Sequence, residues 1–358
     1  MFKNLASAIT ATMFFLLFIA ALPWNCQKPT PAKHSFFAET SGIRFGLWVS
    51  GVYHQDPEFK NACLDSVKIK TTLVEICSSD SAKNKYYPIN YYIRNSKFVQ
   101  LNYLYNRKQG KVSFAATKKE RQAYQDSLDV MLQLYQPVYV CVEREEANPN
   151  YYFGPVTWYK KELKKAQETG KKYGVQVSNG GITTRDLTIM VYRDLQDNDS
   201  SKCKSWADRC LPGSLAQQLN SRRNVALEEK IKRLDSLFDA YKKYCDVVNF
   251  HWYEPVKYRG ETYFPEIENI DSATVGALDQ AIAFLKKRTG KNAICNEMGQ
   301  INSNPKLTES MVDAARNSKL LYCGWFSGDL GFGSATPFFT PSGFLTQTGK
   351  AFAQKSNF

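Results

Sequence analysis

Short apolar runs alternate with longer amphipathic segments along most of this chain. Each run holds four or more mostly apolar residues, many of them β-branched or aromatic, which favours a strand. Runs that are apolar on both faces are typical of parallel strands buried on both sides. Eight strands are predicted: Ile43–Val49, Thr71–Cys77, Phe98–Tyr105, Val138–Glu145, Val175–Gly180, Val247–Tyr253, Asn292–Glu297 and Leu320–Phe326.

The segments between these runs repeat apolar residues at helical spacing. Helices are predicted over Glu120–Tyr135, Trp158–Tyr173, Leu227–Tyr244, Ala273–Arg288 and Leu307–Asn317. Gly174 and Gly290 stand where two of these segments end, which is typical of a helix C-cap before a strand. Eight strands alternating with helices predict an α/β fold, a single (β/α)8 TIM barrel.

One connection is longer than the others. Between Thr183 and Ala226 the pattern predicts a short helix over Asp186–Gln196 and then a polar loop that contains Cys203 and Cys210. In a barrel this connection leaves the carboxyl ends of the strands, where long loops shape a substrate cleft. The two cysteines are the best candidates for a local disulfide if the protein is exported.

The N-terminal segment is predicted to lie outside the barrel. Lys3 precedes the apolar stretch Ile9–Leu22, which has the length of a signal-peptide core and is short for a membrane span. Cys26 follows where a bacterial lipoprotein is cleaved and acylated, although the three residues before it are not the small ones usual there. The alternative to acylation is simple cleavage and secretion.

These features predict the domain organisation and the location. We expect a signal peptide over residues 1–25, a polar tether over 26–40 and the barrel over 41–358. The protein is then exported, as a secreted, periplasmic or cell-envelope lipoprotein. A lipid on Cys26 would be its only attachment to a membrane.

The chain is basic, with a formal net charge of +13 and three histidines. Because the lysines are spread along the predicted helices, most of them are expected to form solvated helix faces. The alternative is attraction to an acidic polysaccharide or an anionic surface. No nucleic-acid-binding motif and no Cys/His cluster with zinc spacing accompanies the charge. We therefore expect no nucleic-acid partner, no metal, no cofactor and a monomer.

Acidic residues close two of the predicted strands, VYVCVEREE (Val138–Glu146) and NAICNEMG (Asn292–Gly299). A carboxylate at the end of a buried strand is costly to desolvate, so these positions are candidates for a functional site. Strand alternation groups side chains by face: Cys141, Glu143 and Glu145; Ala293, Cys295 and Glu297; Asn249, His251 and Tyr253; Leu321, Cys323 and Trp325. If the last member of each group points inward, the barrel mouth holds two glutamates, a histidine and two aromatic residues.

This combination suits the hydrolysis of a glycosidic bond. Two carboxylates about 5 Å apart can act as nucleophile and as general acid and base. A tryptophan offers a flat apolar face for a sugar ring, while His251 and Tyr253 can bind hydroxyl groups or orient the nucleophile. Glu75 and Asp329 are weaker acidic candidates at other strand ends.

The chain resembles the clan A glycoside hydrolases, secreted bacterial (β/α)8-barrel enzymes. The resemblance covers Ile43–Gln354 and lies in CVEREEAN, VSNGG, VNFHWY, CNEMG and CGWF, which follow in order on the fourth to eighth strands, and in the closing LTQTGKAFAQ. It implies that Glu297 is the nucleophile and Glu145 the acid/base, although the neighbouring Glu143 and Glu146 leave the choice of acid/base open. It also implies a carbohydrate substrate bound by Asn179, His251 or Tyr253, and Trp325.

One position departs from the clan. The residue before the acid/base glutamate is usually an asparagine that binds the sugar 2-hydroxyl, and here it is Arg144. An arginine is longer and cannot accept a hydrogen bond. It can bind a substrate carboxylate, lower the pKa of the acid, or fill the pocket. The sequence thus predicts a retaining glycoside hydrolase acting on a β-linked oligo- or polysaccharide by double displacement. The alternative is a weakly active or inactive glycan-binding barrel in which Arg144 has ended turnover.

Overall fold

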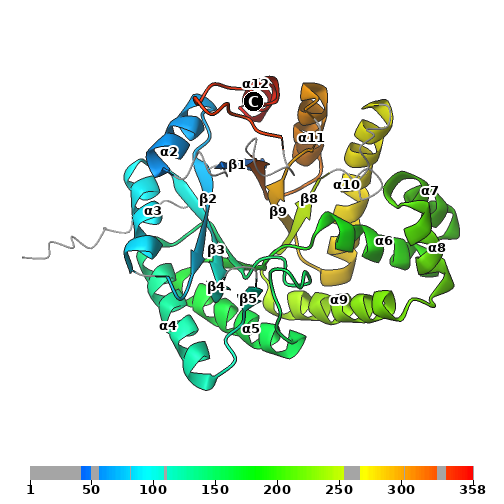
Figure 1. Cartoon of the computed structure of the whole chain (residues 1–358), viewed down its shortest axis with the longest axis horizontal. Helices are drawn as coiled ribbons and strands as arrows, with labels where there is room; N and C mark the ends of the chain where they lie inside the picture. Colours follow the sequence, from blue (N-terminus) through cyan, green and yellow to red (C-terminus); the bar gives the residue numbers. More distant parts are fainter. Residues whose placement is uncertain are drawn as a thin grey trace, which may run out of the picture. The chain divides into compact units, whose positions relative to one another are not determined.

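Eight parallel strands form a barrel surrounded by helices in this computed structural model (Figure 1). The strand order is β7-β6-β3-β2-β1-β10-β9-β8. The first and last strands of the chain, β1 and β10, pair with each other, and the two ends of the sheet are β7 and β8. The strands are β1 (Arg44–Val49), β2 (Thr71–Cys77), β3 (Phe98–Leu104), β6 (Tyr139–Val142), β7 (Gln176–Asn179), β8 (Val248–Trp252), β9 (Ala293–Met298) and β10 (Tyr322–Ser327), with the hairpin β4 (Asn106–Lys108) and β5 (Lys111–Ser113). The predicted α/β fold with a single (β/α)8 barrel is confirmed.

The structure describes residues 42–49, 56–80, 82–108, 111–253, 267–301, 303–328 and 336–357, which belong to one compact unit, Phe36–Phe358. The N-terminal apolar stretch, Cys26 and Asp329 lie outside the described residues. No helix within these ranges combines the length and hydropathy that crossing a bilayer requires.

One or more helices follow each barrel strand and cover its outer face. They are α2 (Pro57–Ser66), α3 (Ala82–Arg94), α4 (Lys118–Tyr135), α5 (Val156–Tyr173), α6 (Thr184–Asn198), α7 (Ser200–Cys210), α8 (Gly213–Ser221), α9 (Val225–Tyr244), α10 (Ile267–Thr289), α11 (Pro305–Asn317) and α12 (Gln347–Ser356). Gly174 caps α5 with a φ of 70°, the left-handed conformation that glycine adopts without strain, as its position in the sequence predicts.

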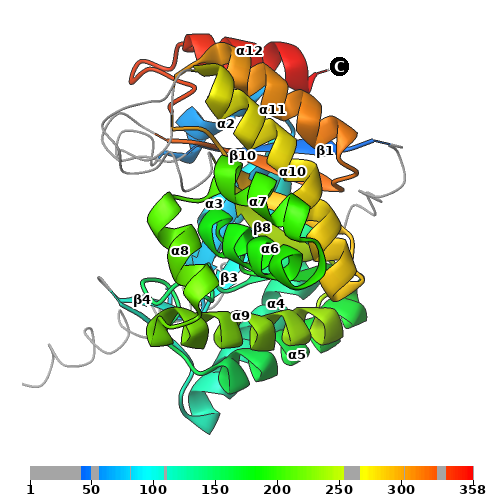
Figure 2. The same ribbon diagram turned by 90° about the vertical axis from the view of Figure 1, so that its right-hand side faces the viewer.

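The long connection after β7 is helical throughout most of its length. Helices α6, α7 and α8 lie together on one flank of the barrel, between α9 and α10 (Figures 1 and 2). The predicted polar loop around Cys203 and Cys210 is wrong, because both residues lie on α7 and face its buried side. Two helical turns separate them by about 10 Å along the axis, too far for a disulfide. Neither cysteine forms a disulfide.

Asn179 closes the barrel between β7 and β8. Its side-chain oxygen accepts a hydrogen bond from the Asn249 backbone N–H (2.7 Å), and its amide donates to the Asn249 carbonyl (2.9 Å). The Asn179 side chain thus makes the bonds that a strand backbone would make. One residue pair, Ile182 and Phe250, continues the seam as a parallel bridge.

Polar side chains fill the middle of the barrel. Asn249 donates to the side-chain oxygen of Asn296 (2.7 Å), and Asn296 donates to that of Asn102 (3.0 Å). The Asn249 oxygen in turn accepts the backbone N–H of Asn296 (3.0 Å). All three asparagines are buried, and their amides satisfy one another. This reciprocal pairing ties β8 to β9 directly beneath the barrel mouth.

Candidate functional site

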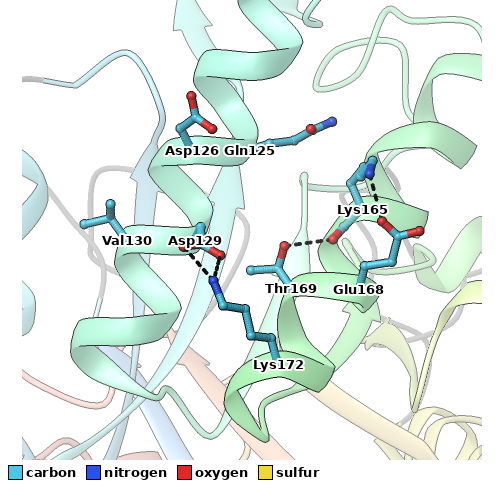
Figure 3. Close-up of a pocket in the computed structure, with 8 residues that line it drawn as sticks. All are labelled: Gln125, Asp126, Asp129, Val130, Lys165, Glu168, Thr169 and Lys172. Atoms are coloured by element: carbon cyan, nitrogen blue, oxygen red, sulfur yellow. Dashed lines mark hydrogen bonds and ion pairs between the residues drawn. The ribbon is translucent and has the colours of Figure 1, made fainter.

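A surface hollow of about 450 Å³ lies between α4 and α5, on the outside of the barrel (Figure 3). Both of its lysines are paired with acidic residues of the same hollow: Lys172 lies 3.0 Å from Asp129, and Lys165 lies 2.9 Å from Glu168. It is far from the carboxyl ends of the strands, where barrel enzymes carry their sites. The acidic residues singled out in the sequence meet instead at those strand ends.

Glu145 lies at the mouth of the barrel in the turn that follows β6. The strand ends at Val142, and Glu143 and Glu145 both have positive φ values, 64° and 43°. The predicted strand over Val138–Glu145 is therefore too long, and strand alternation does not apply to its last residues. The turn, rather than the strand face, directs Glu145 inward.

The turn sends its three glutamates in different directions. Glu143 is buried, and its carboxylate accepts the backbone N–H of Tyr105 (2.9 Å). Glu146 is buried as well and accepts hydrogen bonds from Tyr241 and from Asn179. Burial raises the pKa of both carboxyl groups. Only Glu145 among the three has a partly exposed side chain, 12%, so it is the one available to a substrate.

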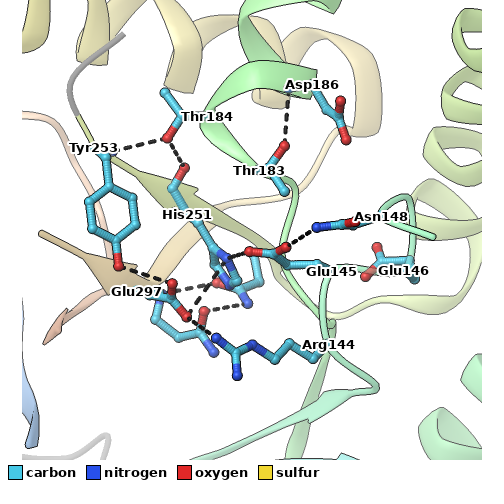
Figure 4. A network of polar contacts seen from close by, with 12 residues as sticks. Arg144, Glu145, Glu146, Asn148, Thr183, Thr184, Asp186, His251, Tyr253 and Glu297 are labelled. Atoms are coloured by element: carbon cyan, nitrogen blue, oxygen red, sulfur yellow. Dashed lines mark hydrogen bonds and ion pairs between the residues drawn. The ribbon is translucent and has the colours of Figure 1, made fainter. Parts of the chain in front are cut away.

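Glu297 reaches the same mouth from β9. The Tyr253 hydroxyl donates to Glu297 Oε1 (3.0 Å), and an Arg144 nitrogen lies 3.6 Å from Oε2. Tyr253 and His251 project from the end of β8 as their alternation predicts, and both reach the acidic pair (Figure 4). One carboxylate oxygen of Glu297 and one of Glu145 lie within 4.8 Å of each other.

His251 joins the two carboxylates. Its Nδ1 lies 2.9 Å from Glu145 Oε1 and 3.9 Å from Glu297 Oε2. Burial alone would lower the pKa of His251, but the two glutamates raise it above its ordinary value. Burial likewise opposes ionisation of Glu145, but hydrogen bonds from His251 and Asn148 and the charge of Arg144 lower the pKa of this carboxyl. Both shifts favour the charged pair, with the proton on the histidine.

Arg144 lies between two acidic side chains. Its guanidinium is 3.6 Å from Glu297 and 3.7 Å from Glu75, and it stacks over the rings of Tyr151 (4.5 Å) and Trp48 (5.3 Å). These ion pairs are longer than hydrogen bonds. The arginine thus fills part of the mouth and places a positive charge beside Glu297.

Replacing His251 by glutamine is expected to lower the free energy of unfolding by about 3 kcal/mol at pH 6, because it leaves Glu145 buried without its cationic partner. In the wild type, the raised pKa of His251 predicts that stability falls as pH rises from about 6.5, the ordinary histidine value, through the folded value. The variant should lose this slope. Urea unfolding between pH 5 and 9 measures both effects; an unchanged slope would contradict the pairing.

Glu145, His251 and Glu297 are also the one group of described side chains whose potential metal-binding atoms lie within 4.8 Å of one another. A cation there would lie against the guanidinium of Arg144 and would compete with the proton that the raised pKa of His251 favours. Two positive groups of the chain, Arg144 and protonated His251, already lie against these two glutamates. The site fits a protonated histidine better than a metal ion.

Solved structures with the same arrangement of strands and helices are glycoside hydrolases. A family 39 glycoside hydrolase from Bacteroides cellulosilyticus WH2 matches with a TM-score of 0.55 and 10% identity, over 88% of this chain and 64% of that one. The Pseudomonas stutzeri endoglucanase Cel5A matches with a TM-score of 0.52 and 10% identity, over 87% and 93%. A family 30 endoxylanase from Clostridium papyrosolvens C71 matches with a TM-score of 0.52 and 9% identity, over 88% and 72%.

The fold is the (β/α)8 barrel that these glycoside hydrolases share. At these identities the likeness concerns the fold alone. The chain spans just under two thirds, 64%, of the family 39 structure. No family model matches the sequence, and no curated protein matches it.

The side chain of Asn179 does not reach the mouth of the barrel. Its side chain is fully buried, and each of its polar atoms bonds to Asn249 or Glu146. The prediction that Asn179 contacts the substrate is therefore wrong. Its side-chain amide is fully engaged between β7 and β8 and does not face the cleft.

Trp325 does not reach the mouth either. It is fully buried among the outer helices, stacked on Phe338 (5.4 Å between ring centroids) and close to Phe352 of α12 (5.4 Å). The neighbouring Phe326 faces the mouth instead, half-buried and 4.7 Å from the ring of Trp48. The predicted face of this strand was out by one residue, which reverses every side chain on it.

Trp325→Ala is accordingly expected to destabilise the barrel by about 3–5 kcal/mol, the cost of emptying a large core position. Phe326→Ala should cost clearly less, because its ring is already partly solvated. Chemical denaturation of the two variants, side by side, measures the difference. Equal losses would contradict the assignment of Trp325 to the core and Phe326 to the mouth.

Several residues of the mouth went unrecognised in the sequence. Trp48 and Phe326 could have been identified, because each is an aromatic residue next to the carboxyl end of a predicted barrel strand. Asn148, Arg185 and Lys230 come from a turn and from helices, where no strand periodicity identifies them. These three line a cavity of about 290 Å³ together with Glu145 and His251.

Proposed function

We propose that this protein is a retaining glycoside hydrolase that acts on a β-linked oligo- or polysaccharide. The observation that carries the proposal is the approach of Glu145 and Glu297 to within 4.8 Å at the carboxyl end of the barrel. Retaining glycosidases hold their two carboxyl groups about 5–5.5 Å apart, whereas inverting ones leave about 6.5–9.5 Å for a water molecule. The spacing here supports double displacement.

Glu297 is the nucleophile in this proposal. Tyr253 donates to Oε1, which fixes the carboxylate plane and leaves Oε2 free to attack the anomeric carbon. The C–O bond to the departing sugar breaks as the bond to Oε2 forms. Arg144 lies on the Oε2 side and places a positive charge beside the attacking oxygen.

Glu145 and His251 supply and recover the proton as a unit. Because His251 holds the proton in the free protein, it passes through Glu145 to the departing oxygen. In the second half of the reaction, water gives a proton back to the pair and its oxygen attacks the anomeric carbon, releasing Glu297. This differs from the simpler expectation that the charge of Glu297 keeps Glu145 protonated, since the pKa of Glu145 is lowered.

The second candidate function is a glycan-binding barrel without turnover. It is favoured by Arg144, whose guanidinium lies 3.6 Å from Glu297 and takes up space beside the nucleophile. An ion pair that persists with substrate bound would hold Glu297 away from the anomeric carbon. The cleft and its aromatic rim would still bind sugar.

A panel of aryl β-glycosides tests the two functions against each other. Under the first, at least one glycoside is hydrolysed, and NMR of the first-formed sugar shows the β-anomer. Inversion would exclude double displacement. Under the second, no glycoside is hydrolysed, yet oligosaccharide changes the tryptophan fluorescence.

We also propose that the protein works outside the cytoplasm, on the support of its N-terminal sequence, Ile9–Leu22 followed by Cys26. Cell fractionation with and without Cys26→Ser tests this. A lipid anchor predicts that the variant moves from the envelope to the soluble exported fraction. Wild-type protein found in the cytoplasm would contradict export.

A further inference from the structure

The cavity beside Glu145 extends away from Glu297. It has a volume of about 290 Å³, and its wall is formed by Glu145, Asn148, Asn150, Thr183, Thr184, Arg185, Asp186, Lys230, His251 and Tyr253. Glu145 lies between Glu297 on one side and Asn148, with the first turn of α6, on the other (Figure 4). If Glu145 protonates the departing oxygen, the leaving sugar enters this cavity.

The charges that line the cavity leave one cation without a partner. Glu145 pairs with His251, and the buried Asp186 pairs with Lys230. Arg185 is exposed, and no described side chain forms an ion pair or hydrogen bond with its guanidinium. The cavity therefore carries a net positive charge.

Two other features distinguish this cavity from an apolar sugar platform. The described residues of its wall include one tyrosine, Tyr253, and no phenylalanine or tryptophan, so stacking contributes little there. Asn148, Asn150 and Thr183 offer hydrogen-bonding groups. Affinity in such a cavity depends on hydrogen bonds and charge.

We propose that the cavity binds a leaving-group sugar that carries an oxyanion, recognised by Arg185 with Lys230 beside it. A planar guanidinium binds such groups through paired hydrogen bonds. The oxyanion is the carboxylate of a uronic acid or a sulfate ester. A cationic sugar does not fit, because the one buried carboxylate not engaged by His251, that of Asp186, already holds Lys230. The inference rests on the proposed function, since that defines the leaving-group side.

The test compares β-linked disaccharides that share the glycone selected by the aryl-glycoside panel and differ in the leaving sugar: glucose, glucuronate or glucose 6-sulfate. The wild type should have a kcat/KM about tenfold or more higher for at least one anionic sugar than for glucose. Arg185→Ala should remove this preference, and Arg185→Lys should keep part of it. The anionic sugar preferred distinguishes carboxylate from sulfate.

Arg223→Ala is the matched control, because Arg223 is an exposed arginine that does not line the cavity. It should keep the wild-type preference. Equal kcat/KM values for neutral and anionic sugars, or a preference that survives Arg185→Ala, would overturn the inference while leaving the hydrolase intact.

Failure of the hydrolase proposal is recognised separately, by the absence of turnover on every aryl glycoside. Calorimetric titration with sodium glucuronate, glucose 6-sulfate and glucose then tests the cavity directly. Binding of an anionic sugar to the wild type but not to Arg185→Ala supports the oxyanion site. No binding, or binding unchanged in the variant, refutes it.

Discussion

Glu297→Gln is expected to reduce kcat/KM on an aryl β-glycoside by about four orders of magnitude or more, the scale seen when a nucleophile is removed. Glutamine has nearly the same shape and can still accept the hydrogen bond from Tyr253, so the fold should persist. What it lacks is the negative charge and the oxygen that bonds to the anomeric carbon. Steady-state kinetics beside a thermal melt separates loss of chemistry from loss of structure.

The matched control is Glu168→Gln, the same substitution on the exposed face of α5. It should leave kcat/KM within about twofold of the wild type. A slow 2-fluoro glycoside should label the wild type, and mass spectrometry should find one added sugar on the peptide that contains Glu297. A label on a different glutamate, or Glu297→Gln activity within tenfold of wild type, would overturn the assignment of the nucleophile.

Glu145→Ala is expected to have an effect that depends on the leaving group. With a sugar or an alkyl group, which departs only when protonated, kcat/KM should fall by about 10²–10⁴-fold, the usual contribution of a general acid. With dinitrophenolate, which departs without a proton, bond cleavage should change little. Hydrolysis of the glycosyl-enzyme, the second step, should then be slow, because no base activates water.

Azide distinguishes this role from a structural one. It needs no deprotonation, so it should accelerate the variant on the dinitrophenyl substrate and yield a β-glycosyl azide, while the wild type gains nothing. Glu146→Gln serves as the comparison, because Glu146 is buried behind the site and bonded to Tyr241. Equal losses on good and poor leaving groups would contradict an acid/base role for Glu145.

The strands of the barrel were predictable because burial on both faces gives each strand a short, nearly continuous run of apolar residues. All eight predicted runs overlap the observed strands. Six of them contain the whole strand, whereas β9 and β10 each extend one residue beyond the predicted end. The connection after β7 was less predictable. Its surface is polar on α7 and α8, and the apolar positions that bury those helices, such as Trp206 and Leu219, are too sparse to stand out.

The faces of the strands were harder to predict than the strands themselves. The register of β9 shifts at a bulge near Glu297, so Asn296 and Glu297, though adjacent, both meet residues inside the barrel. Simple alternation predicts both Glu297 and Cys295 inside the barrel. The prediction is correct for Glu297, but Cys295 packs outward, against the helices. On β10 no bulge turns the predicted residue inward, so Trp325 lies in the outer core and the prediction for it is wrong.

The roles of individual polar residues depend on contacts between distant parts of the chain. The sequence shows Asn179 at a strand end, but only the fold reveals that β7 and β8 separate enough for its side chain to bridge them. Arg144 was recognised as unusual from its position alone. That it faces Glu297 and Glu75 rather than solvent follows from the turn after β6.

The eight cysteines of the described residues are all buried, and none of them forms a disulfide. In the folded state no oxidant reaches them, so the barrel tolerates an oxidising compartment without any bond between them. Once the chain opens, every thiol becomes reactive within the same molecule. Heating without reductant should therefore trap scrambled forms, and the apparent melting temperature should then vary with heating rate and recover its reversibility when a reductant is added.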